Sequence, residues 1–429
     1  MNKEKWKNRF DALFQKLRFL KEEDPDSEGE IQVEEKELTF GSALGKDLPE
    51  GDLREKLARN RRFVRWRRIV LAALIVLVAG GFTVYNRTHT FTDYVIVDSY
   101  ENEVASGSKY ESVGKNIYRY SSDGISCVSR QNELKWSITY NMQAPVADVC
   151  GGTMAVAEQQ GNQVYIVNED GLVGNFTTLL PILKVRVSKQ GVVAVVLQEE
   201  GVTWVSLYRP DGTAIVNDKT TVGQSGYPLD IDLSPDGEKL AVSYLGIKDG
   251  VIESRVVFYH FGAAGQTEKD HVVSSQSYLD TVIPEVYFTD NSRAVAVADN
   301  GFVVFTGRDV PEESASVSFE DEIVSTFHDG SRIGFLFRSS GEAPYRMELY
   351  SYGGRRKSSR EIDASFDKIR MQNGQILMYN DHHCEVYSSS GRKRFSSAYE
   401  KEIADMFYFS EFRKYMIITR DSFDRIRIS

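Results

Sequence analysis

Eight short segments of mostly apolar, strand-like sequence recur after residue 92, and this repeat limits the folds available to the chain. The segments are NIYRYS from Asn116, TMAVAE from Thr153, GVVAVVLQ from Gly191, KLAVSYL from Lys239, RAVAVAD from Arg293, RIGFLFR from Arg332, QILMYND from Gln375 and KYMIITR from Lys414. Their starts lie 37, 38, 48, 54, 39, 43 and 39 residues apart. A four-stranded propeller blade takes about 40–45 residues, so we expect an all-β propeller over residues 92–429. We favour eight blades over seven, and the two long intervals predict loop insertions in blades four and five.

The clearest unit runs from Leu229 to Leu245 and reads LDIDLSPDGEKLAVSYL. Two alternating strands flank a turn made of Ser234, Pro235, Asp236 and Gly237. Proline presets the φ angle of a turn and glycine accepts a positive φ. The unit therefore predicts a tight antiparallel reversal, and similar Asp-Gly or Ser-Gly turns recur between later strands.

The two ends of the repeat region predict a closed ring. The last unit ends after its third strand, at Ser429, and one unassigned strand, DYVIVDSY from Asp93 to Tyr100, precedes the first unit. We expect this strand to complete the last blade, because closing the ring removes an open sheet edge. A β-sandwich or a solenoid would not explain eight similar units together with a divided one.

A run without charged residues, IVLAALIVLVAGGFTVY from Ile69 to Tyr85, precedes the repeat. At about 1.5 Å per residue, a helix of this length reaches roughly 25 Å, near the short end of what crosses a bilayer core. We predict a transmembrane helix over 69–86, in contact with the lipid bilayer, with Trp66 and Tyr85 at the two interfaces. A buried core helix is the alternative, but the run is apolar on all sides rather than along one stripe.

Arginines on one side of this run predict its orientation. Six of them precede it closely, namely Arg59, Arg61, Arg62, Arg65, Arg67 and Arg68. Since positive flanking charge stays in the cytoplasm, we expect a cytoplasmic N-terminus and an extracytoplasmic propeller at the plasma membrane. A cleaved signal peptide is the competing interpretation, but its basic lead is short and the lead here is 68 residues long.

The residues before the run divide into three parts. Residues 1–20 predict a basic amphipathic helix whose apolar face contains Trp6, Phe10, Leu13, Phe14 and Leu17. Such a helix binds either an anionic membrane or a groove on a partner, and both alternatives stay open. Residues 21–51 predict an acidic flexible linker, and residues 52–68 predict a basic juxtamembrane helix.

Two segments carry a resemblance to known families. LSPDGEKLAVSY, within the unit described above, resembles the strand–turn–strand signature of WD40- and TolB-type propellers. GISCVSRQNELKWSITY, from Gly124 to Tyr140, resembles a quinoprotein-like blade. Together with the basic-flanked apolar run, the chain resembles membrane-anchored propeller proteins of Gram-positive bacteria that have no assigned function. The resemblance implies a fold and no function, since propellers host unrelated activities.

Charge and motifs exclude several functions. From Thr88 onward the chain carries 34 Lys and Arg against 47 Asp and Glu, whereas nucleic-acid binding needs a basic face. Quinoprotein enzymes have a docking Trp in most blades, but this region has only Trp136 and Trp204. No G-x-S-x-G elbow and no phosphate-binding loop is present. We therefore predict no cofactor.

The cysteines and histidines do not predict a site either. Three cysteines, an odd and low number, argue against a disulfide framework, while a single Cys127–Cys150 bridge stays open. The tetrapeptide from Asp381 to Cys384 reads DHHC, but protein acyltransferases set this motif among many cysteines between several membrane spans. At most two of its side chains converge on a strand, so we predict no metal-binding or catalytic residue.

The expected function is that of a non-enzymatic, single-pass membrane protein. Its propeller would serve as a scaffold or sensor that binds a protein partner or ligand in the cell envelope, at its loops or near its axis. The alternative is an extracytoplasmic enzyme or cofactor-binding propeller acting on cell-wall, peptide or glycan substrates, which would need carboxylates or a metal converging at the mouth of the central channel. A third possibility is a structural subunit of a larger membrane assembly. The sequence leaves the oligomeric state open.

Overall fold

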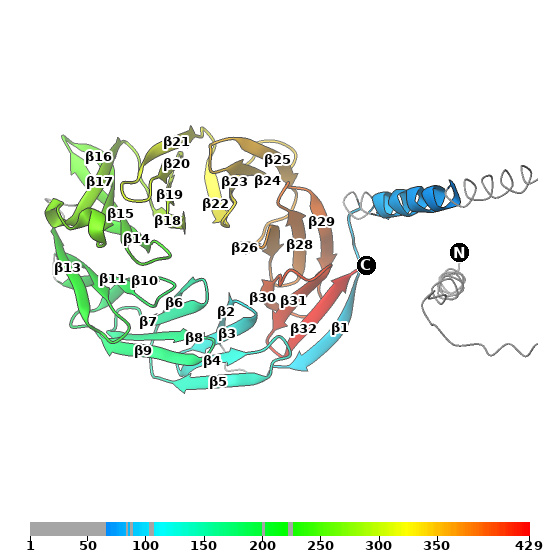
Figure 1. Cartoon of the computed structure of the whole chain (residues 1–429), viewed down its shortest axis with the longest axis horizontal. Helices are drawn as coiled ribbons and strands as arrows, with labels where there is room; N and C mark the ends of the chain where they lie inside the picture. The colour runs from blue at the N-terminus through cyan, green and yellow to red at the C-terminus, as the bar shows by residue number, and fades with distance from the viewer. Residues whose placement is uncertain (1–65, 83–84, 86–88, 103–106, 200–201, 222–225) are drawn as a thin grey trace, which may run out of the picture. The chain divides into compact units, whose positions relative to one another are not determined.

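Eight four-stranded antiparallel sheets surround a common axis in a computed structural model of the chain (Figure 1). The structure describes residues 66–82, 85, 89–102, 107–199, 202–221 and 226–429. Within these residues the repeat region is an all-β, eight-bladed propeller, so the prediction of eight blades is confirmed and the alternative of seven is wrong.

The strands follow one another in sequence order within each of the first seven blades. Blades 1 and 2 consist of β2 (Lys109–Val113), β3 (Asn116–Ser121), β4 (Gly124–Val128), β5 (Leu134–Thr139), β6 (Pro145–Cys150), β7 (Thr153–Glu158), β8 (Gln163–Asn168) and β9 (Gly171–Thr177). Blades 3 and 4 consist of β10 (Ile182–Val187), β11 (Val193–Glu199), β12 (Val202–Tyr208), β13 (Ala214–Thr221), β14 (Tyr227–Leu233), β15 (Lys239–Lys248), β16 (Val251–His260) and β17 (Val272–Leu279).

The remaining blades complete the ring. Blades 5 and 6 consist of β18 (Glu285–Asp290), β19 (Arg293–Ala298), β20 (Gly301–Thr306), β21 (Glu312–Ser318), β22 (Ile323–His328), β23 (Arg332–Arg338), β24 (Tyr345–Ser351) and β25 (Arg356–Ile362). Blades 7 and 8 consist of β26 (Lys368–Gln372), β27 (Gln375–Tyr379), β28 (His383–Ser388), β29 (Lys393–Ala398), β30 (Ile403–Phe407), β31 (Lys414–Thr419), β32 (Ser422–Ile428) and β1 (Tyr94–Glu101).

The recurring segments found in the sequence are the second strands of the blades. Seven of these strands begin at the residue where the corresponding sequence segment begins, and β11 begins two residues later, at Val193. The predicted insertion in blade 4 is confirmed, whereas the predicted insertion in blade 5 is wrong. Blade 5 is regular, whereas blade 4 contains two ten-residue strands, β15 and β16, and two short 3-10 turns, η1 (Ala263–Gly265) and η2 (Lys269–His271).

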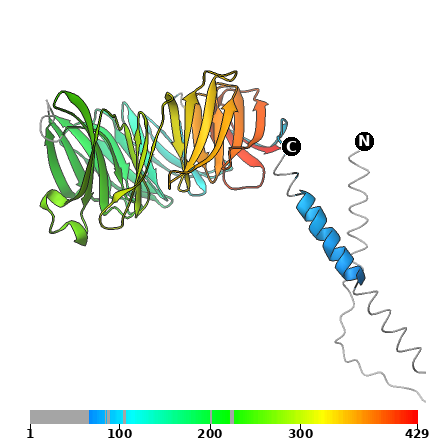
Figure 2. The same cartoon turned by 90° about the horizontal axis from the view of Figure 1, so that it is seen from above.

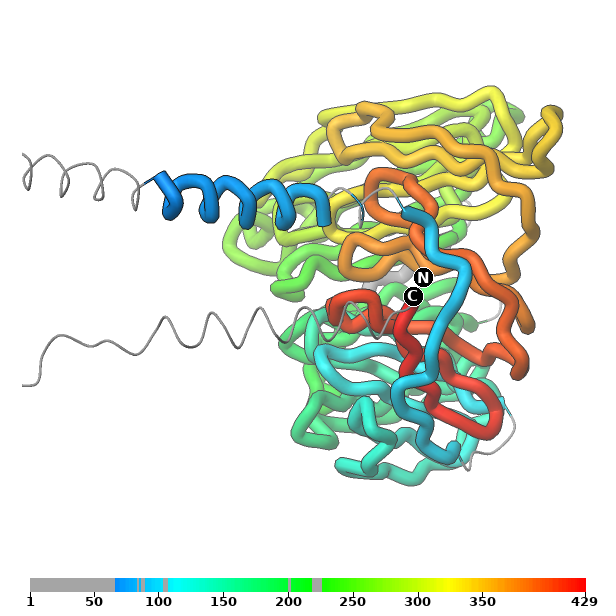
Figure 3. Tube along the Cα trace, turned by 90° about the vertical axis from the view of Figure 1, so that its right-hand side faces the viewer, coloured from blue at the N-terminus to red at the C-terminus, as the bar shows by residue number. Residues whose placement is uncertain are grey.

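The ring is closed by the strand that precedes the first blade. β1 pairs antiparallel with β32, from Tyr94 opposite Ile428 to Glu101 opposite Ser422. Figure 3 shows these two strands, from opposite ends of the propeller sequence, lying side by side. The predicted completion of the last blade is confirmed.

The predicted turn between β14 and β15 has the expected geometry. Gly237 has a φ of 71°, and its N–H donates to the Ser234 carbonyl at 2.7 Å. The Ser234 hydroxyl accepts the N–H of Lys239 at 2.9 Å. The Asp236 N–H donates to Asn291 at 3.0 Å, so the turn also contacts the next blade.

Apolar side chains pack between neighbouring blades and form the core. In blade 6, for example, Ile333, Phe335 and Phe337 pack against Val295, Phe302 and other residues of blade 5. Figure 2 shows the sheets from the side, where neighbouring blades stand next to each other around the ring. This packing holds each blade in place, so the inner strands occupy defined positions around the axis.

The segment before the propeller is described in part. Residues 66–82 form a helix that includes Trp66, Arg67 and Arg68, and its apolar side chains from Ile69 to Phe82 are exposed. Within the described part of the chain, no helix combines the length and the apolar character needed to cross a bilayer. The predicted amphipathic helix, linker and most of the juxtamembrane helix lie outside the described residues, and so do Arg59, Arg61, Arg62 and Arg65.

The three cysteines are free thiols, so the Cys127–Cys150 bridge that the sequence left open is absent. The DHHC tetrapeptide spans a turn and the start of β28, as expected. Cys384 is buried there, and burial raises the pKa of its thiol to about 12.

Candidate functional site

The first strand of each blade lies nearest the ring axis, and one of its edges has no neighbouring strand (Figure 1). A free edge leaves backbone N–H groups that need acceptors. Carboxylates on the inner strands supply three of these acceptors, each reaching the inner strand of the next blade. The pairs are Asp148 with the N–H of Val187 at 2.7 Å, Asp230 with that of Val286 at 3.0 Å, and Asp232 with that of Phe288 at 2.6 Å.

Arg186 on β10 stands among these carboxylates. Its guanidinium contacts Asp230 at 3.1 Å and Asp232 at 3.7 Å. Lys184, two residues earlier on the same strand, contacts Asp230 at 2.8 Å. The Asp230 side chain is 3% exposed, whereas those of Arg186 and Lys184 are 28% and 36% exposed. The bases therefore face solvent on one side and the buried acids on the other.

The acids of this group are incompletely neutralised. Burial raises the pKa of Asp148, and the positive charge of Arg186 only partly offsets this effect. Burial raises the pKa of Asp232 well above its usual value, and the nearby charge of Asp148 acts in the same direction. Because both carboxyl groups are destabilised in their charged form, an additional cation at this position would be stabilised.

A second group of charges lies on the inner strands of blades 7, 8 and 1. Arg370 on β26 contacts Asp405 on β30 at 3.4 Å and Glu111 on β2 at 3.6 Å. The Tyr379 hydroxyl donates a hydrogen bond to Asp405. Burial raises the pKa of Glu111, although Arg370 opposes this effect. This group repeats the arrangement around Arg186, with one arginine shared by acids from two other blades.

A third group links blades 5 and 6. The Thr326 hydroxyl donates to Glu285 at 3.0 Å, and His328 lies 3.6 Å from the same carboxylate. The His328 ring stacks on Tyr287 with the ring centroids 3.5 Å apart. Burial alone would raise the pKa of Glu285, but its hydrogen bonds and charge interaction with His328 hold this pKa below its usual value.

We name these three groups together the inner-edge charge belt. Its members are Glu111, Asp148, Lys184, Arg186, Asp230, Asp232, Glu285, His328, Arg370 and Asp405. The belt contains six carboxyl groups against two arginines and one lysine. Most of these side chains retain partial exposure, so a molecule that approaches along the axis meets a surface with more acid than base.

None of the belt residues was named in the sequence prediction. A signal was present, because acids alternate at Asp230 and Asp232 and bases alternate at Lys184 and Arg186. Alternation assigns residues to one face of a strand but does not identify which strand lies nearest the axis.

The other residues singled out in the sequence are not members of the belt. Ser234, Pro235, Asp236 and Gly237 form the turn at one end of blade 4, and Trp66, Arg67, Arg68 and Tyr85 precede the propeller. Among the described residues, no group of three or more His, Cys, Asp or Glu side chains is placed to hold a metal ion.

A pocket of about 320 Å³ with both polar and apolar lining lies between blades 3 and 4. Its wall includes the buried side chains of Val205, Leu207 and Leu240, while Asp270 and His271 from the η2 insertion line its rim. Both rim residues have positive φ angles, of 56° and 59°. The insertion in blade 4 thus shapes one side of this pocket.

Comparison with known proteins gives a family and distant structural similarities. Residues 87–428 match the family described as "Family of unknown function (DUF5711)". No curated protein matches the chain. BamB from Moraxella catarrhalis is 9% identical, with 78% of this chain and 100% of that chain covered and a TM-score of 0.48. Hydrazine synthase from Kuenenia stuttgartiensis is 11% identical, with 70% and 98% covered and a TM-score of 0.42. Hsv2p from Kluyveromyces lactis is 8% identical, with 73% and 98% covered and a TM-score of 0.43.

Proposed function

We propose that this chain, which belongs to the family of unknown function DUF5711, is a non-enzymatic, single-pass membrane protein. Its extracytoplasmic propeller binds a basic segment of a partner protein at the inner-edge charge belt. The observation that carries this proposal is the excess of carboxyl groups over bases on the inner strands. The belt residues come from all eight blades, so a bound segment would contact most of the ring at once.

Charge complementarity selects the chemistry of the partner. Lysine or arginine side chains entering the belt would lie beside Asp148, Asp232 and Glu111, whose charged forms are disfavoured by burial. A new positive charge lowers the pKa of each of these acids and is stabilised in return. Existing bases at Arg186 and Arg370 fix the spacing of the acids, so they favour a segment with separated rather than adjacent charges.

The membrane anchor rests on the sequence. The uncharged run from Ile69 to Tyr85 and the arginines before it support a span with the propeller outside the cytoplasm. The predicted amphipathic helix at residues 1–20 would then contact the inner leaflet or a cytoplasmic partner. In this arrangement the protein connects a partner bound outside the cell to a contact inside it, as a sensor or scaffold does.

The experiment compares crosslinked partners of the full chain in cells. The wild type, an Asp148→Asn/Asp232→Asn variant and a matched Glu322→Gln/Glu361→Gln variant are crosslinked, purified and analysed by mass spectrometry. The control removes two exposed acids from outside the belt. We expect one partner with a lysine- or arginine-rich segment to be recovered with the wild type and the control, and to be lost with the belt variant. Equal recovery with all three proteins would contradict the proposal.

One observation favours a second candidate function of another class. Asp148 and Asp232 interact with one another and both have raised pKa values, as general acids of hydrolases do. The second candidate is an extracytoplasmic hydrolase of cell-wall, peptide or glycan substrates. Release of soluble fragments from cell-wall material by the wild type, and not by Asp232→Asn, would favour this candidate over partner binding.

A further inference from the structure

One blade interface differs from the other seven at a single position of the second strand. In every blade, one face of the second strand packs toward the preceding blade. In seven blades, the middle residue on that face is apolar and fully buried. These side chains are Val156, Val195, Val242, Ala296, Phe335, Met378 and Ile417. In blade 1 the equivalent residue is Arg119, two positions after Ile117, which packs against blade 8.

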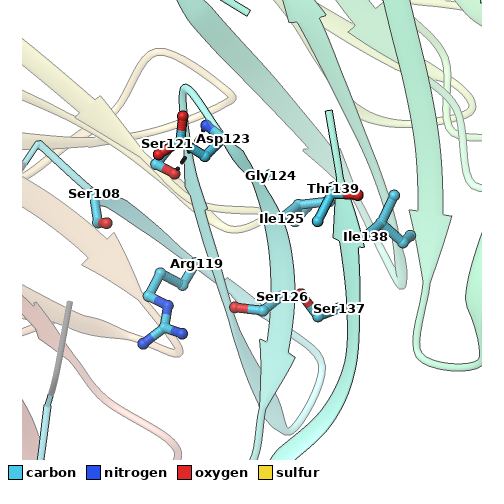
Figure 4. Close-up of a pocket in the computed structure, with 10 residues that line it drawn as sticks. All are labelled: Ser108, Arg119, Ser121, Asp123, Gly124, Ile125, Ser126, Ser137, Ile138 and Thr139. Atoms are coloured by element: carbon cyan, nitrogen blue, oxygen red, sulfur yellow. Dashed lines mark hydrogen bonds between the residues drawn. The ribbon is translucent and has the colours of Figure 1, made fainter. Parts of the chain in front are cut away.

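The residues that lie beside Arg119 on the next two strands of blade 1 are also polar. Arg119 lies opposite Ser126, and Ser126 lies opposite Ser137. These three residues, together with Ser108, Ser121, Asp123, Gly124, Ile125, Ile138 and Thr139, line a pocket of about 210 Å³. Figure 4 shows the Arg119 guanidinium and the hydroxyls of Ser126 and Ser137 near one end of the pocket, with Ser121 and Asp123 at the other.

Two polar side chains of this pocket, Ser126 and Arg119, form no side-chain hydrogen bond within the described part of the chain. Ser126 is only 6% exposed, yet its hydroxyl has no hydrogen-bond partner among the described residues. Arg119 forms no hydrogen bond or ion pair with any described side chain. Arg119 is half-buried, and neither its guanidinium nor the Ser126 hydroxyl is among the fully buried polar atoms without a partner. Both groups can therefore donate to a ligand in the pocket that supplies acceptors.

We propose that this pocket binds the oxyanion group, carboxylate or phosphate, of a small molecule. The planar fork of Arg119 matches the paired oxygens of either group, and Ser126 and Ser137 would donate to the same oxygens. Asp123 lines the far end, where its carboxylate accepts a hydrogen bond from Ser122 at 3.2 Å. A second negative charge would be repelled there, so the ligand carries a single oxyanion group and a neutral or donor group at its other end.

This site is separate from the inner-edge charge belt and has the opposite preference for charge. Arg119 belongs to β3, the second strand of blade 1, whereas the belt residues belong to the first strands. The residues that line this site all belong to blade 1 or directly precede it, and Arg119 lies on the face of β3 whose Ile117 packs against blade 8. Failure of partner binding at the belt would leave this site unaffected, and the converse also holds.

The test measures binding of two probes to the full chain in detergent micelles. Sodium acetate is followed by saturation-transfer difference NMR and inorganic phosphate by ³¹P line broadening, at constant ionic strength. The proteins are the wild type, Arg119→Gln, Arg119→Lys, Ser137→Val and the control Arg355→Gln, which changes an exposed arginine of another blade. Far-UV circular dichroism establishes that each variant is folded.

We expect acetate or phosphate to bind the wild type and Arg355→Gln equally. Arg119→Gln and Ser137→Val should weaken the affinity by about tenfold or more, because each removes a charged or polar donor from the oxyanion. The affinity of Arg119→Lys should fall between those of the wild type and Arg119→Gln, since lysine keeps the charge and loses the planar fork. The probe that binds more tightly distinguishes a carboxylate from a phosphate ligand.

Two results would overturn the proposal. One is the absence of binding of both probes to the wild type at about 50 mM, a concentration that nearly saturates a site with a Kd of about 1 mM. The other is an affinity in Arg119→Gln equal to that of the wild type. If Arg119→Gln does not fold, an unchanged affinity in Ser137→Val is decisive against the site.

Discussion

Replacing Arg186 with methionine tests whether the inner-edge charge belt stabilises the ring. The substitution removes the positive charge that contacts Asp230 at 3.1 Å and Asp232 at 3.7 Å, while it keeps a long apolar side chain. Removing one partner of a buried ion pair costs about 3–5 kcal/mol. We expect the lower end, about 3 kcal/mol at pH 7, because Arg186 is 28% exposed and Lys184 still contacts Asp230.

The loss of unfolding free energy in Arg186→Met should depend on pH, because Arg186 partly neutralises acids that titrate. Without Arg186, the pKa values of Asp148 and Asp232, already raised by burial, rise further. An acid whose folded-state pKa lies above its unfolded value opposes folding at neutral pH, and this penalty disappears as the pH falls below the unfolded value. The difference in unfolding free energy between wild type and variant should therefore shrink from pH 7 to pH 4.5.

Urea unfolding of the full chain in detergent, followed by circular dichroism at both pH values, measures this difference. Arg338→Met is the control, because its ion pair with Glu322 at 2.9 Å joins side chains that are 63% and 64% exposed. Exposed pairs contribute less than about 1 kcal/mol. A loss below about 1 kcal/mol for Arg186→Met, or a loss that grows as the pH falls, would refute the assigned role of Arg186.

Three further predictions concern the ring closure, one turn and the thiols. Burial would raise the pKa of Asp424, but hydrogen bonds from neighbouring groups, including Tyr399 at 2.6 Å, hold this pKa below its usual value. Asp424→Asn should therefore lower the free energy of unfolding by about 2 kcal/mol at pH 7. This loss should become smaller as the pH falls through the range in which Asp carboxyl groups titrate. Urea unfolding that shows the same loss at all pH values would contradict the prediction. Gly237→Ala should lower stability by about 1 kcal/mol, because residue 237 has a φ of 71°. Gly330→Ala, at a position with open space and no positive φ, should change stability less, and equal melting temperatures for both variants would show that the turn carries no such constraint. Cys384 has a pKa of about 12, so its alkylation at pH 7.5 should be at least about a hundredfold slower than in unfolded protein; fast labelling of the folded chain, mapped by mass spectrometry, would contradict its burial.

The fold was predictable because its signals are local. Alternation and turn residues recur with each blade, so the second strands could be located to within two residues. The closing strand was predictable because the last unit lacks one strand and an alternating segment precedes the first unit. The error on the insertion in blade 5 has a simple cause, since an interval between two repeats does not show in which of the two blades the extra residues fold.

The inner-edge charge belt and the pocket around Arg119 were not predicted from the sequence, for a physical reason. Polar residues such as Asp232 look the same in sequence whether their strand faces the axis, a neighbouring blade or solvent. Only the assembled ring brings β6, β10, β14 and β18 together. Arg119 did leave a signal, because it is the one charged residue at a position that is apolar in every other unit, and a comparison of equivalent positions would have found it.

Site-specific photocrosslinking at the inner edge tests the central claim most directly. A photoreactive residue replaces Val324, which lies on the inner strand β22 and is 42% exposed, or Leu172, which lies on the outer strand β9 and is 50% exposed. We predict that illumination in cells links the residue at position 324, and not that at position 172, to a lysine- or arginine-rich segment of one partner protein. A partner that is captured only from position 172, or one linked to position 324 through an acidic segment, would contradict binding at the inner-edge charge belt.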